Sequence, residues 1–141
     1  MKLLCYGTLL GGFLSSSWLN KPEPDPSKLT NVSLRKYLPW INIWGGWELF
    51  QELLSVLHTI SLKYNVSLSN VAVKWVLEQE AVAGAIVGVR LGLKQHLVDN
   101  KKIFSFSLDE KDMLAIAAIQ SKSRDLLQAF GDCGGEYRRR G

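Results

Sequence analysis

The chain has 141 residues, the length of one ordinary domain, and its 47% apolar and 21% charged residues indicate a globular protein rather than a disordered one. Much of the net charge of +4 comes from Arg138, Arg139 and Arg140, and this run indicates a solvated tail more than a nucleic-acid surface, because no aromatic residues interleave with it. No stretch of about 18 uninterrupted apolar residues occurs, so the sequence predicts no membrane-spanning helix.

The cysteine pattern argues against metal and disulfide chemistry. The two cysteines, Cys5 and Cys133, have neither a CxxC partner nor a histidine at metal-binding spacing. Cys5 lies in an apolar run, where a thiol commonly packs as a small hydrophobic group. Two reduced cysteines suit the cytoplasm, so we expect a cytoplasmic protein without a metal site.

The N-terminal segment MKLLCYGTLLGGFL has two interpretations. A charged Lys2, an apolar core and the small residues 15–17 are compatible with a secretory signal. The same run, bounded by glycines, is typical of a buried parallel strand over residues 2–9. Tyr6, Gly7 and Thr8 inside the core argue against the signal.

The middle of the chain predicts a loop and three helices. Residues 20–32 hold three of the four prolines and predict a loop, and residues 33–43 predict a short helix interrupted at Pro39. Apolar residues at helical spacing predict an amphipathic helix over 46–65. Ser67 is a good N-cap for a further helix over 67–79.

The C-terminal half predicts a second strand and more helices. The segment GAIVGV over 84–89 is short, apolar and bounded by glycine, as in a buried strand. Helices are expected over 93–103 and 107–122, the latter opened by a capping box of Ser107 and Glu110. A last helical turn or two is expected near residues 124–130, and 131–141 reads as a tail.

This order of elements predicts an α/β fold built from parallel units with crossover connections. Only two clear strands are present, however, and two parallel strands make a poor sheet with both outer edges open. The sequence therefore predicts part of a sheet, and we expect the isolated chain to be poorly soluble, self-associated or loosely packed.

Three blocks in this order resemble the C-terminal part of the aldo-keto reductases: LLCYGTLLGGFLS, then GGWELFQELLSVLHTISLKYNVSLSNVAVKWVLEQ, then AIVGVRLGLKQHLVDN with FSFSLDEKDM. That family folds as a (β/α)8 barrel. The resemblance implies that residues 2–9 and 84–89 are the last two barrel strands, and that the chain is an incomplete barrel. It also favours the strand interpretation of the N-terminal segment.

The resemblance implies that NADPH is the cofactor. Tyr6 corresponds to the family tyrosine that stacks on the nicotinamide ring, although a core tyrosine is the alternative. Gly7, Thr8 and Leu9 correspond to residues that touch the pyrophosphate.

The second strand supplies the other implied contacts. Gly88 and Arg90 follow it, and Arg90 would hold the 2′-phosphate through paired N–H donors, unless it is a solvated surface arginine. Asn100 corresponds to an asparagine that bonds the adenine. His96 contacts the adenosine phosphate or faces water, and both readings stay open because the segment between Arg90 and Asn100 is longer than in common relatives.

No catalytic residue is identified. The family needs an aspartate, a tyrosine as general acid, a lysine and a histidine, and none of their motifs occurs in the 141 residues. His58 has no nameable partner, and Trp40, Trp44 and Trp47 either pack in the core or cover substrate.

Three explanations follow from this pattern. The chain is a fragment of a reductase, or it is a short product that associates with a partner or with a second copy of itself. The third explanation is a non-catalytic binding module that acts through its open strand edges. A small carbonyl compound is the substrate expected only if the missing half is supplied.

Overall fold

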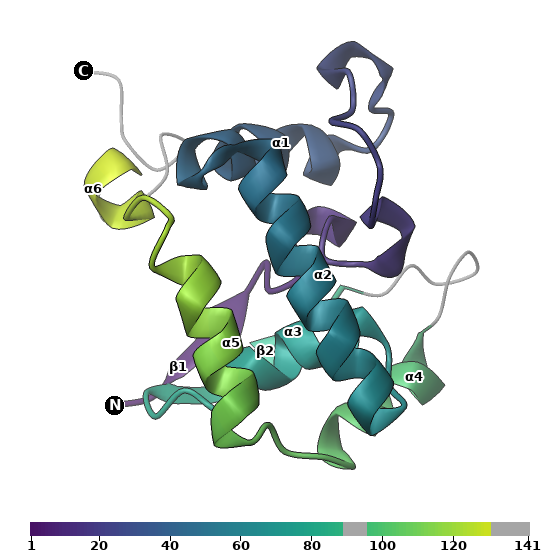
Figure 1. Cartoon of the computed structure of the whole chain (residues 1–141), viewed down its shortest axis with the longest axis vertical. Helices are drawn as coiled ribbons and strands as arrows, with labels where there is room; N and C mark the ends of the chain where they lie inside the picture. Colours follow the sequence, from purple (N-terminus) through teal and green to yellow (C-terminus); the bar gives the residue numbers. More distant parts are fainter. Residues whose placement is uncertain (89–95, 131–141) are drawn as a thin grey trace.

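The computed structural model describes residues 1–88 and 96–130, and within them the chain is a mixed α/β protein (Figure 1). The two strands are β1 (Leu3–Tyr6) and β2 (Val82–Ile86), and the longer helices are α1 (Val32–Trp44), α2 (Gly46–Tyr64), α3 (Leu68–Leu77) and α5 (Glu110–Gln120). The short helices are η1 (Leu10–Gly12), η2 (Ser16–Trp18), η3 (Pro26–Lys28), α4 (Leu97–Lys101), η4 (Lys102–Phe104) and α6 (Leu126–Phe130).

The two strands pair in parallel and form a two-stranded sheet in the described part of the chain. Leu3 lies opposite Val82 and its N–H donates to the carbonyl of Ala81 at 2.8 Å, whereas Leu4 already lies opposite Gly84. The extra residue on β2 is therefore Ala83. A side chain at Gly84 would meet the Leu4 Cδ2 atom at 3.1 Å, so the glycine leaves room for that leucine.

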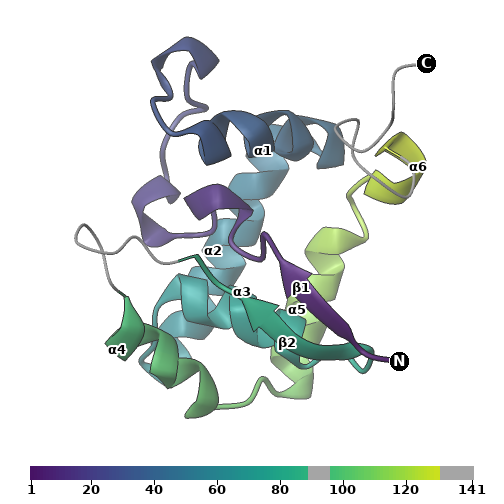
Figure 2. The same cartoon turned by 180° about the vertical axis from the view of Figure 1, so that it is seen from behind.

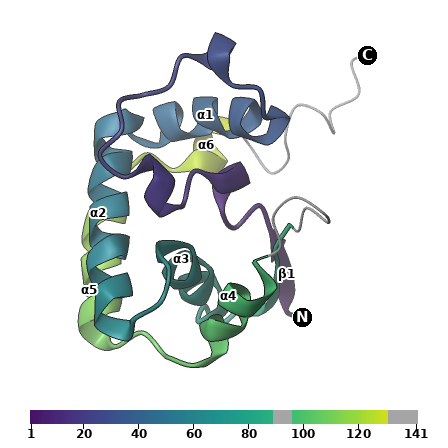
Figure 3. The same cartoon turned by 90° about the vertical axis from the view of Figure 1, so that its right-hand side faces the viewer.

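The elements form three layers. Figure 3 shows the sheet on one side of the molecule, α3 in the middle, and α2 with α5 on the far side. Seen from behind, β1 and β2 lie in front of the helices (Figure 2). The helices therefore cover one face of the sheet.

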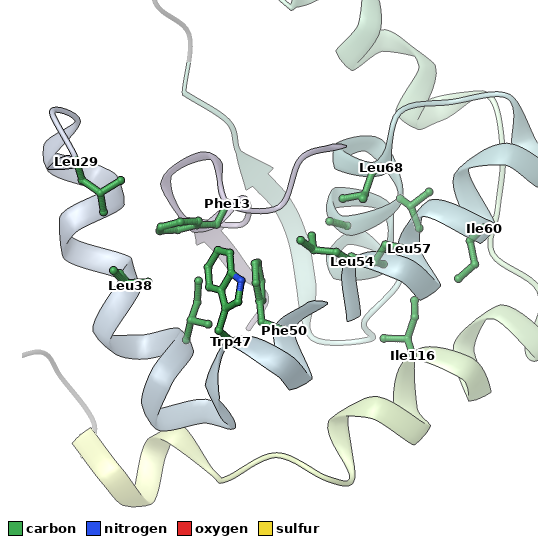
Figure 4. Packing of buried hydrophobic residues seen from close by; sticks show 13 residues of the cluster. Phe13, Leu29, Leu38, Trp47, Phe50, Leu54, Leu57, Ile60, Leu68 and Ile116 are labelled. Carbon is green, nitrogen blue, oxygen red and sulfur yellow. The ribbon is translucent and has the colours of Figure 1, made fainter. Parts of the chain in front are cut away.

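The hydrophobic core lies between the helices and the segment after β1, not within the sheet (Figure 4). Phe13 is fully buried and packs against Trp18, Trp47 and Phe50 with ring centroids 4.9, 5.8 and 6.3 Å away. The Trp47 indole N–H also donates to the carbonyl of Lys21 at 2.8 Å. Of the two interpretations of the tryptophan cluster, packing in the core is therefore the one that Trp47 follows.

Helix starts follow local capping chemistry, with one correction. The Ser67 hydroxyl accepts from the Asn70 N–H, as expected of the N-cap of α3. The capping box of α5 is not the expected pair of Ser107 and Glu110. Asp109 and Asp112 form it, because each carboxylate accepts the backbone N–H of the other, and Glu110 is already the first helical residue.

Pro39 does not interrupt its helix, contrary to the expectation from the sequence. α1 continues from Val32 to Trp44 with Pro39 inside it. Proline has no N–H group, so the Arg35 carbonyl lacks the donor that residue 39 would otherwise supply. Arg35 and Pro39 are both exposed, so water can satisfy that carbonyl. The buried residues Leu38 and Ile41 hold the other side of the helix in the core.

The strands are shorter than expected. β1 ends at Tyr6 rather than residue 9, because Gly7 has a φ of +70° and the chain turns into η1, where Leu10 also has a φ of +48°. β2 covers 82–86 rather than 84–89. The helix expected over 93–103 is divided into the short α4 and η4, and residues 93–95 lie outside the described part.

The face of the sheet opposite the helices is open and apolar. Leu4, Tyr6 and Ile86 expose 68%, 66% and 58% of their surfaces. Leu4 and Tyr6 are two residues apart, so their side chains share a face of the strand. Among the described helices, none has the length and apolar character needed to cross a bilayer.

Candidate functional site

Five of the implied cofactor residues lie near the carboxyl ends of the two strands: Tyr6, Gly7, Thr8, Leu9 and Gly88. Tyr6 lies opposite Ile86 in the parallel register, so the segments that follow these two residues leave the sheet at the same edge. The 7–9 turn follows β1, and Gly88 lies two residues beyond β2. Such an edge, next to helix N-termini, is where parallel α/β folds commonly bind ligands.

Tyr6 offers an accessible ring at this edge. Its side chain is 66% exposed, so the alternative of a buried core tyrosine does not hold. The following Gly7 has a φ of +70°, and a side chain there would collide with the Tyr37 hydroxyl. Glycine therefore permits both the turn and the close approach of α1.

Thr8 carries an unsatisfied hydroxyl in this turn. Its Oγ1 is buried and has no hydrogen-bond partner among the described residues. Such an atom usually finds a hydrogen-bond partner, so this hydroxyl is a polar group that the fold leaves unexplained. Leu9, by contrast, packs against the core and can offer only its backbone.

The contacts expected after β2 are only partly described. Gly88 is exposed, with nothing within 4 Å of where a Cβ would lie. Arg90 lies outside the described residues. His96 is exposed at the start of α4 and its side chain caps nothing, whereas Asn100 is half-buried in that helix.

The N-terminus of α3 connects the two halves of this edge, which the sequence reasoning missed. The Ser69 hydroxyl donates to the Leu14 carbonyl at 2.8 Å, in the segment after β1. The Ser67 hydroxyl donates to the Asp99 carboxylate at 2.7 Å, and the Asn70 amide donates to the Asp99 carbonyl at 3.0 Å. The signal available in the sequence was the group of polar residues Ser67, Ser69 and Asn70 at the start of a mostly apolar helix.

A second polar cluster brings together a lysine, a tyrosine and two aspartates. Lys63 Nζ donates to Asp109 at 2.6 Å and to both oxygens of Asp112 at 2.9 and 3.0 Å. The Tyr64 hydroxyl donates to Asp112 Oδ2 at 2.6 Å. The Asp112 side chain is only 7% exposed. These contacts join the end of α2 to the start of α5.

The pKa directions in this cluster indicate a structural role. Burial and the hydrogen bond to Asp112 raise the pKa of Tyr64, so its hydroxyl is a weaker acid than a free phenol. Lys63 holds the pKa of Asp109 below its usual value, and the two carboxylates raise the pKa of Lys63. A tyrosine that acts as a general acid near neutral pH is favoured by a lowered pKa, so the direction at Tyr64 does not favour that role.

The described residues form no group of metal ligands. His58 is half-buried on α2, and its backbone carbonyl accepts from Ser61 at 2.7 Å. Within residues 1–88 and 96–130, no three His, Cys, Asp or Glu side chains gather closely enough to hold a metal ion.

Most of the chain matches a known protein family. The model of the aldo/keto reductase family matches residues 1–121. The chain is also similar to flagellar radial spoke protein 5 of Chlamydomonas reinhardtii, with 35% identity over 80 residues. That match covers 55% of this chain but 15% of the relative, so the chain spans a small part of that protein's length. Because the family match covers most of the chain, the protein belongs to the aldo/keto reductase family.

Proposed function

We propose that this chain is the C-terminal, cofactor-binding part of an NADPH-dependent aldo-keto reductase, with β1 and β2 as the last two strands of a (β/α)8 barrel. The observation that carries the proposal is that the 7–9 turn after Tyr6 and the segment with Gly88 leave the sheet at the same edge. Family membership and the predominantly oxidoreductase character of the family support it.

Each proposed contact has a physical reason. The exposed Tyr6 ring offers a flat surface on which a nicotinamide ring can stack, which presents one face of the ring to substrate. The free Thr8 hydroxyl and the backbone of Gly7 and Leu9 are donors for the pyrophosphate. Arg90 would bind the 2′-phosphate as a bidentate cation, and Asn100, with His96 nearby, would contact the adenosine part.

Hydride transfer from NADPH to a carbonyl compound requires an acid for the carbonyl oxygen. Among the described tyrosines, Tyr64 donates a hydrogen bond to a carboxylate, and its raised pKa disfavours that role. We therefore propose that the acid comes from polypeptide outside these 141 residues, and that this chain alone binds cofactor without turning substrate over.

The test is a calorimetric titration of the 141-residue chain with NADPH and with NADH. Arg90→Ala should weaken NADPH by about tenfold or more, the value of one lost charge-assisted contact, and leave NADH nearly unchanged. Arg124→Ala is the matched control, because Arg124 is exposed in the turn before α6. A folded chain that binds neither nucleotide refutes the proposal, and equal losses for both remove Arg90 from the phosphate role.

A second candidate is a non-catalytic association module that uses the fold for packing alone. The open apolar face of Leu4, Tyr6 and Ile86 favours it, as does similarity to a protein named for flagellar radial spokes. NADPH-dependent reduction of carbonyl compounds by the 141-residue chain would refute this candidate.

A further inference from the structure

The short helix α4 has little packing of its own to hold it in place. It consists of the five residues Leu97–Lys101, and none of them is buried. A helix of this length is not stable by itself in water. The next buried residue along the chain is Ile103 in η4. Polar contacts with the rest of the fold therefore have to fix the direction of α4.

Asp99 makes two such contacts with the start of α3, which lies beside α4 (Figure 3). Its carboxylate Oδ2 accepts from the Ser67 hydroxyl at 2.7 Å, and its main-chain carbonyl accepts from the Asn70 amide at 3.0 Å. Asn70 is only 1% exposed, so water does not compete for its amide. The positive end of the α3 dipole also favours a carboxylate at this place.

The ion pair of Asp99 does not contribute to this docking. Lys102 Nζ lies 3.8 Å from Asp99 Oδ1, and the lysine is half exposed. Such a pair at the surface contributes little, and it joins α4 to the turn that follows it rather than to α3. Ser67 and Asn70 are therefore the partners through which Asp99 ties the two helices together.

We infer that Asp99 is a positioning residue for the adenosine end of the nucleotide site, because it docks α4 onto α3 and so sets the direction of Asn100. The inference rests on the proposed function, in which Asn100 and His96 contact the adenosine part. Consecutive residues on a helix point about 100° apart around its axis. Docking of the Asp99 side chain therefore fixes the side of α4 from which Asn100 projects.

The same turn of α3 also holds the segment that follows β1. The Ser69 hydroxyl donates to the Leu14 carbonyl at 2.8 Å, between the two residues that hold Asp99. One helix start thus anchors both α4 and the segment that continues from the 7–9 turn. The two ends of the proposed nucleotide site are placed relative to each other by this one element.

A residue that acts through position leaves a characteristic signature. A ligand that binds only the docked form of α4 loses apparent affinity in proportion to the fraction of molecules in which α4 is docked. Hydrogen exchange at the amides of α4 reports the same fraction. Affinity and protection from exchange should therefore fall together when the docking is weakened.

The experiment uses the full 141-residue chain and 2′,5′-ADP, which is the adenosine end of NADPH, in a calorimetric titration. Asp99→Ala and Ser67→Ala should each weaken binding about tenfold and speed exchange at residues 97–101 by a similar factor. The double variant should bind little worse than either single variant, since both remove the same contact. Asp99→Asn keeps an oxygen that accepts from Ser67 and should retain most of the affinity.

Ser67 is also the N-cap of α3, so its replacement can destabilise the fold in general. Asp109→Ala is the matched control, because it removes the N-cap of α5 and one acidic charge without touching α4. Asp109→Ala should leave the affinity for 2′,5′-ADP unchanged. The Asp99 variants test the inference even where Ser67→Ala does not fold.

The outcomes separate this inference from the proposed function. Parallel losses of affinity and protection, with rescue by Asp99→Asn and no effect of Asp109→Ala, support it. Faster exchange with unchanged affinity overturns it, because α4 docking is then structural only. A loss in Asp99→Ala that Ser67→Ala does not reproduce and Asp99→Asn does not restore also overturns it, in favour of direct contact with the nucleotide. Both of these results leave the proposed function standing, whereas an unaltered chain that binds no 2′,5′-ADP refutes the proposed function and this inference with it.

Discussion

Replacing Asp112 with alanine tests whether the polar cluster between α2 and α5 stabilises the fold. Asp112 is nearly buried and accepts hydrogen bonds from Lys63, Tyr64 and the Asp109 N–H. Loss of the N-terminal cap interaction costs about 1 kcal/mol. Loss of a hydrogen bond from Tyr64 to a charged carboxylate costs about 1.5 kcal/mol. Lys63 is 43% exposed and keeps Asp109, so its ammonium is solvated and adds little.

We therefore expect Asp112→Ala to lower the free energy of unfolding by about 2–3 kcal/mol. With a urea dependence of about 1.5 kcal/mol per molar, the unfolding midpoint should fall by about 1.3–2 M, measured by far-ultraviolet circular dichroism. Combining this change with Tyr64→Phe should give a coupling energy of about 1 kcal/mol. A midpoint within about 0.3 M of the original, or fully additive losses, would mean that the cluster is a solvated surface feature.

Three further predictions concern the turn, the bridge and pH. Gly7→Ala should lower the free energy of unfolding by about 1–2 kcal/mol, because residue 7 has a positive φ and the new Cβ meets the Tyr37 hydroxyl. Adding Tyr37→Phe should recover part of this loss in thermal unfolding, and full recovery would exclude backbone strain. Asn70→Ala should cost about 1–3 kcal/mol and speed hydrogen exchange in α4, whose Asp99 carbonyl loses its donor; unchanged exchange there would refute the bridging role. The lowered pKa of Asp109 stabilises the fold above pH 3.8, the ordinary pKa of this group, and that stability is lost as the pH falls further. The raised pKa of Tyr64 stabilises the fold below pH 10.0, and that stability is lost as the pH rises further. Tyr64→Phe should flatten the alkaline loss of stability, and an unchanged alkaline slope would contradict the assignment.

The fold could be predicted from sequence where local chemistry decides it. The apolar spacing of α2 and the hydroxyl of Ser67 specify a helix and its start without help from the rest of the chain. The capping box of α5 could not be assigned from spacing alone, because Ser107 with Glu110 and Asp109 with Asp112 both fit the pattern. Only the position where the chain enters the helix distinguishes them.

The candidate site, like the fold, could be predicted from the sequence only in part. Tyr6, Gly7, Thr8 and Gly88 were identified from the resemblance, and their roles remain predictions. The Ser69 contact with Leu14 joins residues 55 positions apart, and no local pattern encodes such a distance.

By itself, the sequence determined the alternation of strand and helix, the family and the residue types at the strand ends, because periodicity, caps and motifs are local properties. Only the tertiary structure decided that Pro39 stays within a helix, since Arg35 and Pro39 are exposed while Leu38 and Ile41 are held in the core. Only the tertiary structure, too, decided that Tyr64 is a poor acid and that one face of the sheet is open. Both depend on which distant side chains the packing brings close and which it leaves in water.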